Sequence, residues 1–191
     1  MVSVGFDTYC SLLDETVKEL QDIKEHKFKS SIVDINVTAF IPDEWVGSKE
    51  QKMLEYKRIS EAKTPTELDE IVNEWKDRFS KLEEPVENLI KLIKLKMSAT
   101  GAGISSVRET AGGIRIYSEY SAAEIRIILS KLPFDIKRNI KMVKLPKACK
   151  DGEFVLIFNS SHFNFDELFN KLSDLFYHIS KTISEYTRNS K

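Results

Sequence analysis

Apolar and polar residues alternate along this chain with two periods, one typical of helices and one typical of strands. Residues 6–25 place large apolar side chains on one helical stripe and charged side chains elsewhere, which predicts an amphipathic helix. A polar linker follows up to about residue 31. Apolar residues then recur at every second position from Val33 to Ile41, which predicts a strand that ends at Pro42.

Three helices are predicted after this strand. The first two begin at capping-box patterns, Ser48–Gln51 and Thr64–Glu67, in which the side chains of both end residues can satisfy free backbone amides. The third begins at Pro85, since proline is well suited to the first turn of a helix, and ends near Gly101.

The second half of the chain mixes strands with helices. A short helix is predicted from Ser121 to Pro133 and a long one from Asn164 onward. An Ala111-Gly112-Gly113 turn joins the first two of four predicted strands. These strands are 104–110, 114–120, 140–145 and 154–158. The pattern predicts an α+β fold with a mixed or antiparallel sheet of about four or five strands, about five helices and one preceding N-terminal helix.

Composition and charge restrict the class of protein. The 191 residues are 41% hydrophobic and 31% charged with 7 Gly and 5 Pro, which excludes collagen-like and disordered classes. No apolar run is long enough for a membrane span, and the amino terminus does not resemble a secretory signal. Cys10 and Cys149 are far apart and lack zinc-ligand spacing, as is usual for a protein in a reducing compartment. A cytoplasmic location is therefore expected. Residues 1–100 carry 15 basic and 20 acidic residues, which favours a basic protein partner for this half. A pI near 6.3 argues against a dedicated DNA-binding domain.

The sequence lacks the motifs of common catalytic sites. No glycine is followed by Lys-Ser or Lys-Thr as a phosphate-binding loop requires, and neither H-E-x-x-H nor G-x-S-x-G occurs. Gly101-Ala-Gly103 follows a helix rather than a strand, and His26, His162 and His178 have no metal-ligand spacing around them. We therefore expect neither catalysis nor a bound cofactor or metal in this chain.

Two charged features have both a functional and a structural interpretation. A basic residue recurs at every third position, at Arg138, Lys141, Lys144, Lys147 and Lys150. These cations could follow nucleic-acid phosphates, but period three does not keep side chains on one strand face, so an edge strand protected by lysines is the simpler interpretation.

The second feature lies on the helix predicted from Thr64. Glu74, Asp77 and Arg78 share its outer face, away from the apolar stripe that includes Trp75. They are either a solvated face with an internal Asp–Arg arrangement or a polar docking site for another protein.

Several separated motifs, in a fixed order, carry a resemblance to a known family. They are Ala39-Phe40-Ile41-Pro42-Asp43-Glu44-Trp45-Val46 with Glu50-Gln51, Tyr56-Lys57-Arg58-Ile59, Glu74-x-x-Asp77-Arg78-Phe79, Glu84-Pro85-Val86-x-Asn88-Leu89 and the amino-terminal Val4-Gly5-Phe6-Asp7-x-Tyr9-Cys10-x-Leu12-Leu13. With these motifs the chain resembles the C-terminal domain of bacterial transcription-repair coupling factors (Mfd). The sequence departs from the family at Ser80, where glycine is usual, and at Trp75 and Lys76, which replace an aliphatic pair.

The resemblance implies a regulatory role. Members of the family are multidomain DNA translocases that depend on ATP and magnesium, remove stalled RNA polymerase and recruit UvrA. Their C-terminal domain docks on a UvrB-like module and masks its UvrA-binding surface. This docking restrains the translocase. Residues 1–30 would then be a helix and linker from the end of the translocase (TRG) region, and 31–191 the C-terminal regulatory domain. Glu74, Asp77 and Arg78 match the motif associated with the masking contact. The alternative is a nucleic-acid-binding module that uses the basic residues 137–150, above all Arg138, Lys141, Lys144 and Lys147.

Overall fold

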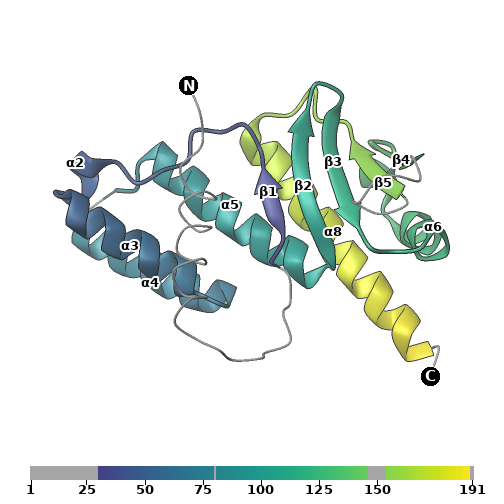
Figure 1. Ribbon diagram of the computed structural model, residues 1–191, viewed down its shortest axis with the longest axis horizontal. Coiled ribbons are helices and arrows are strands. Elements are labelled where there is room, and N and C mark those ends of the chain that lie inside the picture. The colour runs from purple at the N-terminus through teal and green to yellow at the C-terminus, as the bar shows by residue number, and fades with distance from the viewer. Residues whose placement is uncertain (1–29, 80, 146–153, 190–191) are drawn as a thin grey trace. The chain divides into compact units, whose positions relative to one another are not determined.

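The computed structural model describes residues 30–79, 81–145 and 154–189, which fall into two units (Figure 1). Residues 36–94 form the helical unit, and residues 30–35 with 95–189 form the sheet unit. The predicted helix over residues 6–25 and nearly all of the predicted segment 1–30 lie outside the described residues. The proposed boundary between 1–30 and 31–191 therefore stays a prediction.

The helical unit contains α2 (Asp43–Val46), α3 (Lys49–Glu61), α4 (Pro65–Phe79) and the first part of α5 (Glu84–Gly101). The predicted helix starts are confirmed, because the Ser48 and Thr64 hydroxyls accept hydrogen bonds from the backbone amides of Gln51 and Glu67, at 3.1 and 3.2 Å. The apolar stripes of these helices face one another, and their most buried members are Ile59, Leu68, Trp75, Val86 and Leu89.

The sheet unit is a mixed five-stranded sheet with three further helices. The strands lie in the order β1-β2-β3-β5-β4, with β1 parallel to β2 and all other pairs antiparallel. Their bounds are Ile32–Asp34 (β1), Ile104–Thr110 (β2), Gly113–Ser118 (β3), Ile140–Lys144 (β4) and Phe154–Phe158 (β5). The helices are α6 (Ala122–Lys131), α7 (Phe134–Lys137) and α8 (Phe165–Asn189).

One face of the sheet is apolar and lies against α8, which passes behind the strands in Figure 1. Strand register aligns one apolar residue from each strand across this face: Val33, Val107, Ile116, Leu156 and Met142. The side of α8 that contains Leu172, Leu175 and Ile179 is fully buried. Successive residues of a strand point to opposite faces, so the residues that follow these five in the strands belong to the other face.

The α+β prediction is confirmed, and so are the hairpin between β2 and β3 and the interior position of the apolar strand β5. The described residues contain seven helices rather than about five, because the sequence signals for the four-residue helices α2 and α7 are short. β4 lies at the edge of the sheet, as the lysine-protected interpretation of residues 140–145 expects.

The predicted strand over residues 33–41 is wrong beyond Asp34. Its partner β2 ends at Thr110, only two residues after the position opposite Asp34, so a longer parallel strand would have almost nothing to pair with. The backbone of residues 38–41 is instead bound by the helical unit. Tyr56 accepts from the Ile41 amide at 2.9 Å, and Asn88 donates to the Thr38 carbonyl at 3.1 Å.

The β2–β3 turn depends on a glycine whose backbone is left-handed and closely packed. Gly113 has φ of 113°, and a Cβ there would lie 2.4 Å from the Phe158 carbonyl oxygen, whereas a Cβ on Gly112 would meet nothing within 4 Å. We expect Gly113→Ala to lower the free energy of unfolding by about 1–3 kcal/mol through backbone strain. Chemical denaturation of this variant beside Gly112→Ala measures the difference; equal stabilities would contradict it.

Candidate functional site

A buried carboxylate joins α3 and α4. The Glu55 side chain is 1% exposed, yet both of its oxygens are fully engaged. Oε1 accepts from Gln51 Nε2 at 2.6 Å, and Oε2 accepts from the Trp75 indole at 2.7 Å. Two arginines add further donors, Arg58 to Oε2 at 3.0 Å and Arg78 to Oε1 at 3.3 Å. Burial of a carboxylate is tolerated only with such pairing.

Both arginines also bind a second carboxylate nearer the surface. The Arg58 guanidinium forms a bidentate pair with Glu74, with Nη1 3.0 Å from Oε1 and Nη2 bonded to Oε2. Arg78 donates to the same Oε1 at 2.8 Å. These bonds, first that of Arg58 and then that of Arg78, lower the pKa of Glu74 to about 2. We call Glu55, Arg58, Glu74 and Arg78 the Glu55 cluster.

Aromatic rings pack beside the Glu55 cluster. The rings of Trp75 and Trp45 (α2) pack edge-to-face, with their centroids 5.6 Å apart. The centroid of the Trp45 ring lies 4.9 Å from that of the Phe79 ring. The Arg78 guanidinium lies 4.8 Å from the centre of the Phe79 ring. The arginine is therefore held by two carboxylates and one aromatic face, which fixes its position on α4.

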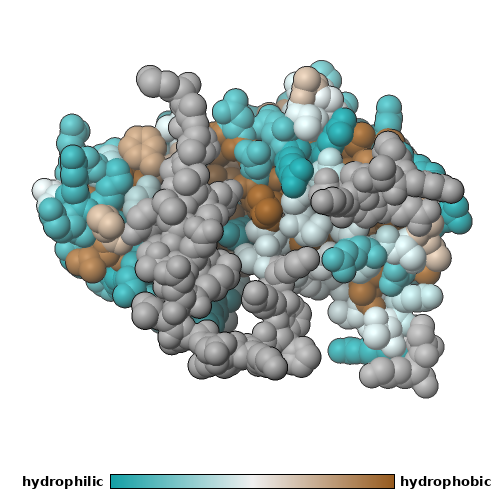
Figure 2. Space-filling model, in the orientation of Figure 1, coloured by the Kyte–Doolittle hydropathy of each residue, from teal (hydrophilic) through white to brown (hydrophobic). Residues whose placement is uncertain are grey.

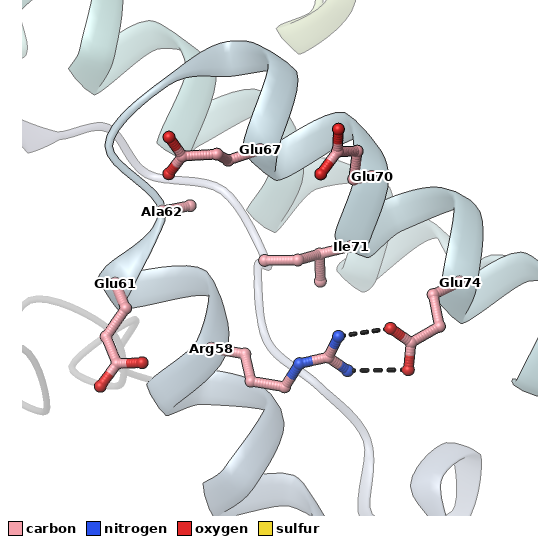
Figure 3. A pocket seen from close by; sticks show the side chains of 7 residues that line it. All are labelled: Arg58, Glu61, Ala62, Glu67, Glu70, Ile71 and Glu74. Carbon is pink, nitrogen blue, oxygen red and sulfur yellow. Dashed lines mark hydrogen bonds and ion pairs between the residues drawn. The ribbon is translucent and has the colours of Figure 1, made fainter.

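An open hollow of about 390 Å³ lies between α3 and α4 beside the cluster (Figure 3). Arg58 reaches across it to Glu74, and the carboxylates of Glu61, Glu67 and Glu70 lie around it. Four glutamates and one arginine give this hollow an excess of negative charge, which suits a basic ligand. Its other lining residues are Ala62 and Ile71.

The three residues singled out on α4 have different surroundings. Glu74 and Arg78 belong to the Glu55 cluster, whereas Asp77 is exposed and has no recorded partner among the described residues. The internal arrangement is therefore a Glu74–Arg78 pair rather than the expected Asp–Arg pair. Arg78 also binds the buried Glu55 carboxylate, so it has a structural partner as well as an exposed position.

The structure brings together motifs that the sequence separates. Trp45, Arg58 and the Glu74–Phe79 segment come from three different motifs and meet at one site. Sequence reasoning missed Glu55, although one signal was present. Glu55 precedes the buried Ile59 by four residues and adjoins the buried Tyr56, so a carboxylate falls on the apolar side of α3.

The described basic residues between 137 and 145 do not all point to one face of the sheet. Arg138 lies at the end of α7, while Lys141 and Lys144 are three residues apart in β4 and point to opposite faces of the sheet. The Lys144 ammonium lies 6.0 Å from the Phe154 ring on the α8 side. Lys147 and Lys150 lie outside the described residues. This arrangement does not favour a single phosphate-binding stripe along the chain.

The described part of the chain offers no metal centre. No three His, Cys, Asp or Glu side chains converge there as a metal site would require. None of the described helices has the length and apolar character needed to cross a bilayer.

Comparison with known proteins identifies similar sequences and a similar fold. A sequence model of the TRCF domain matches residues 35–128, which include the whole Glu55 cluster. The transcription-repair-coupling factor of Staphylococcus haemolyticus (strain JCSC1435) is 31% identical over 124 residues, and that of Staphylococcus aureus (strain NCTC 8325 / PS 47) is 30% identical. Each alignment covers 64% of this chain and 11% of the relative, so the chain spans about a tenth of the length of these curated proteins.

The fold agrees with this result. A crystal structure titled as the C-terminal domain of transcription-repair coupling factor superposes with a TM-score of 0.65, at 18% identity, over 80% of this chain and 93% of that one. Sequence and fold together show that this chain belongs to the transcription-repair coupling factor family and carries its C-terminal TRCF domain.

Proposed function

We propose that this chain is a non-catalytic regulatory domain that docks through α4 on the UvrB-like module of its parent protein. Docking would mask the UvrA-binding surface and restrain an ATP-dependent DNA translocase that removes stalled RNA polymerase in the cytoplasm. ATP and Mg²⁺ would bind to other lobes of the parent protein, and this chain would bind no cofactor. The exposure of Asp77, beside a cluster that fixes its neighbours, is the observation that carries the proposal.

The geometry of α4 supports a docking role. Arg78 is held on one side by Glu55 and Glu74, but 42% of its side chain is exposed. Asp77 precedes it with no internal partner recorded among the described residues. A partner would meet side chains that are already positioned, so little conformational entropy would be lost on binding.

The charge of the hollow between α3 and α4 limits the partner. A basic side chain could pair there with Glu61, Glu67 or Glu70, while Asp77 could accept another cation on the outer face. We therefore propose a mainly basic contact surface on the UvrB-like module.

Binding between this chain and the purified UvrB-like module tests the proposal. We expect Asp77→Ala to weaken this complex by about 2–5 kcal/mol, because a desolvated pair loses one member. The matched control is Asp174→Ala on the exposed side of α8, which should bind like the wild type. The proposal fails if the wild-type chain does not bind the module, or if both variants bind equally well.

The two α4 substitutions should differ in stability. Asp77→Ala should change the free energy of unfolding by no more than about 0.5 kcal/mol, as expected for an exposed residue. Arg78→Ala should lower it by about 1–2 kcal/mol, because Glu55 and Glu74 each lose a donor and Arg78 itself is partly exposed. Urea denaturation of both variants measures this; an equal loss in both would mean that Asp77 is structural as well.

The lowered pKa of Glu74 predicts a pH dependence of stability. The group titrates near 4.5 when unfolded and at about 2 when folded, so its stabilising effect is complete above about pH 5 and is lost as the pH falls towards 2. The difference in stability between wild type and Glu74→Gln should therefore shrink over that interval. Glu70→Gln, which removes an exposed carboxylate of the same hollow, is the control. A difference that stays constant from pH 7 to pH 2 would contradict the prediction.

A further inference from the structure

The Glu55 carboxylate is buried, but one of its hydrogen bonds reaches a side chain at the surface. The Glu55 side chain is 1% exposed, whereas that of Arg78, which donates to it from Nη1 at 3.3 Å, is 42% exposed. The surface over α2 and α3 is mostly hydrophilic (Figure 2), and Glu55 contributes almost nothing to it. A partner protein could therefore contact Arg78 but not Glu55. Any effect of Glu55 on binding must pass through the residues to which it is bonded.

The position of the Glu55 carboxylate is set from the interior. Gln51 Nε2, one turn earlier in α3, donates to Oε1 at 2.6 Å. The indole of the fully buried Trp75 donates to Oε2 at 2.7 Å. Each oxygen thus has its own donor besides the arginines. Because hydrogen bonds weaken steeply with distance and misalignment, the carboxylate cannot turn or shift without losing one of them. Glu55 therefore offers Arg78 a fixed acceptor.

Arg78 depends on Glu55 for its connection to α3. Its other carboxylate partner, Glu74, lies one turn earlier in the same helix α4, and the Phe79 ring is adjacent in sequence. Both of these contacts move with α4. Among the recorded contacts of Arg78 within the described residues, the bond to Glu55 is the one that comes from α3. Arg58 differs, because it belongs to α3 and its bidentate pair with Glu74 links the two helices without Glu55.

The bond to Glu55 also selects the side of the Arg78 guanidinium that is left for a ligand. Both carboxylates accept from the same nitrogen, Nη1, Glu55 at 3.3 Å and Glu74 at 2.8 Å. Neither Nη2 nor Nε has a recorded hydrogen bond among the described residues. These two nitrogens form one edge of the arginine fork, which can bind acceptor oxygens. With the bond to Glu74 alone, the guanidinium could pivot about that contact and present a different edge.

We propose that Glu55 is a positioning residue for docking, which turns Nη1 of Arg78 inward and leaves the Nε–Nη2 edge for the UvrB-like module. This inference rests on the docking function proposed for α4. It gives a buried residue of α3, 23 positions before Arg78 in the sequence, a share in a contact that α4 makes. Without Glu55, the long Arg78 side chain would have to be ordered at the moment of binding, which lowers affinity.

A double-mutant cycle tests the inference, with binding of the full chain to the purified UvrB-like module measured by calorimetry. Glu55→Gln keeps the shape of the side chain and removes its charge. It should weaken binding roughly 2- to 12-fold, the cost of ordering one long side chain on binding. In the Arg78→Ala background, the same substitution should leave the affinity unchanged, because no guanidinium remains to be positioned. A general loss of folding would instead weaken binding in both backgrounds alike.

Two further variants separate positioning from stability. Gln51→Ala removes a donor from the same carboxylate and should lower the melting temperature, but it leaves the bond between Glu55 and Arg78 and should bind like the wild type. Glu55→Asp keeps the charge and guards against a folding defect in Glu55→Gln. Its shorter side chain withdraws the carboxylate from Arg78, whose bond at 3.3 Å is longer than those of Gln51 and Trp75, so it should weaken binding as Glu55→Gln does.

Nuclear magnetic resonance relaxation of the Arg78 Nε–H group in the free chain gives a measurement that does not depend on docking. Its order parameter should fall in Glu55→Gln and stay unchanged in Gln51→Ala. The inference is overturned if Glu55→Gln leaves the order parameter unchanged, or if it weakens binding equally with and without Arg78. Failure of the wild-type chain to bind the module would overturn the docking function itself and, with it, the role of Glu55 in docking. Wild-type binding with no loss of Arg78 order in Glu55→Gln would overturn the role of Glu55 alone.

Discussion

The helical unit is organised around one costly interaction, the burial of the Glu55 carboxylate. Removing a carboxylate from water costs several kcal/mol unless donors replace the lost hydration. Here Gln51, Trp75 and two arginines replace it, and they come from both α3 and α4. The two helices can approach each other only in an arrangement that satisfies this group. Among the described residues no buried side-chain nitrogen or oxygen lacks a partner, so the requirement is met.

That requirement has a consequence for the outer face of α4. Arg58 and Arg78 are oriented inward by Glu55 and outward by Glu74, so the polar surface has little freedom to rearrange. The motif residues therefore have two different roles. Glu74 and Arg78 connect α3 to α4, whereas Asp77 is exposed and has no recorded partner among the described residues. Polar residues at adjacent positions of one helix face can thus have different surroundings, one bonded within the fold and the next exposed.

In the sheet unit the same separation arises from the pleat. Each of β2, β3 and β4 contributes an apolar residue to the α8 side and a cation, one residue later or earlier, to the opposite side. The cations on the face opposite α8 lie among apolar neighbours such as Tyr117 and Val155, so that face is mixed, whereas the five aligned residues on the α8 side are all apolar. In the helical unit, by contrast, polar side chains gather around the hollow between α3 and α4.

Local sequence patterns were enough to predict most helices and strands, and separated motifs indicated the family. The caps at Ser48, Thr64 and Ser121, the hairpin glycines and the apolar periods are local, so they predicted the helices and most strands. Local patterns could not determine where a strand loses its partner, so the strand predicted over residues 33–41 was too long: β1 ends at Asp34. They also could not show that Glu55 is buried or that Arg108, Arg115 and Lys141 are aligned. Burial and register depend on residues distant in sequence, and only the tertiary structure brings those residues together.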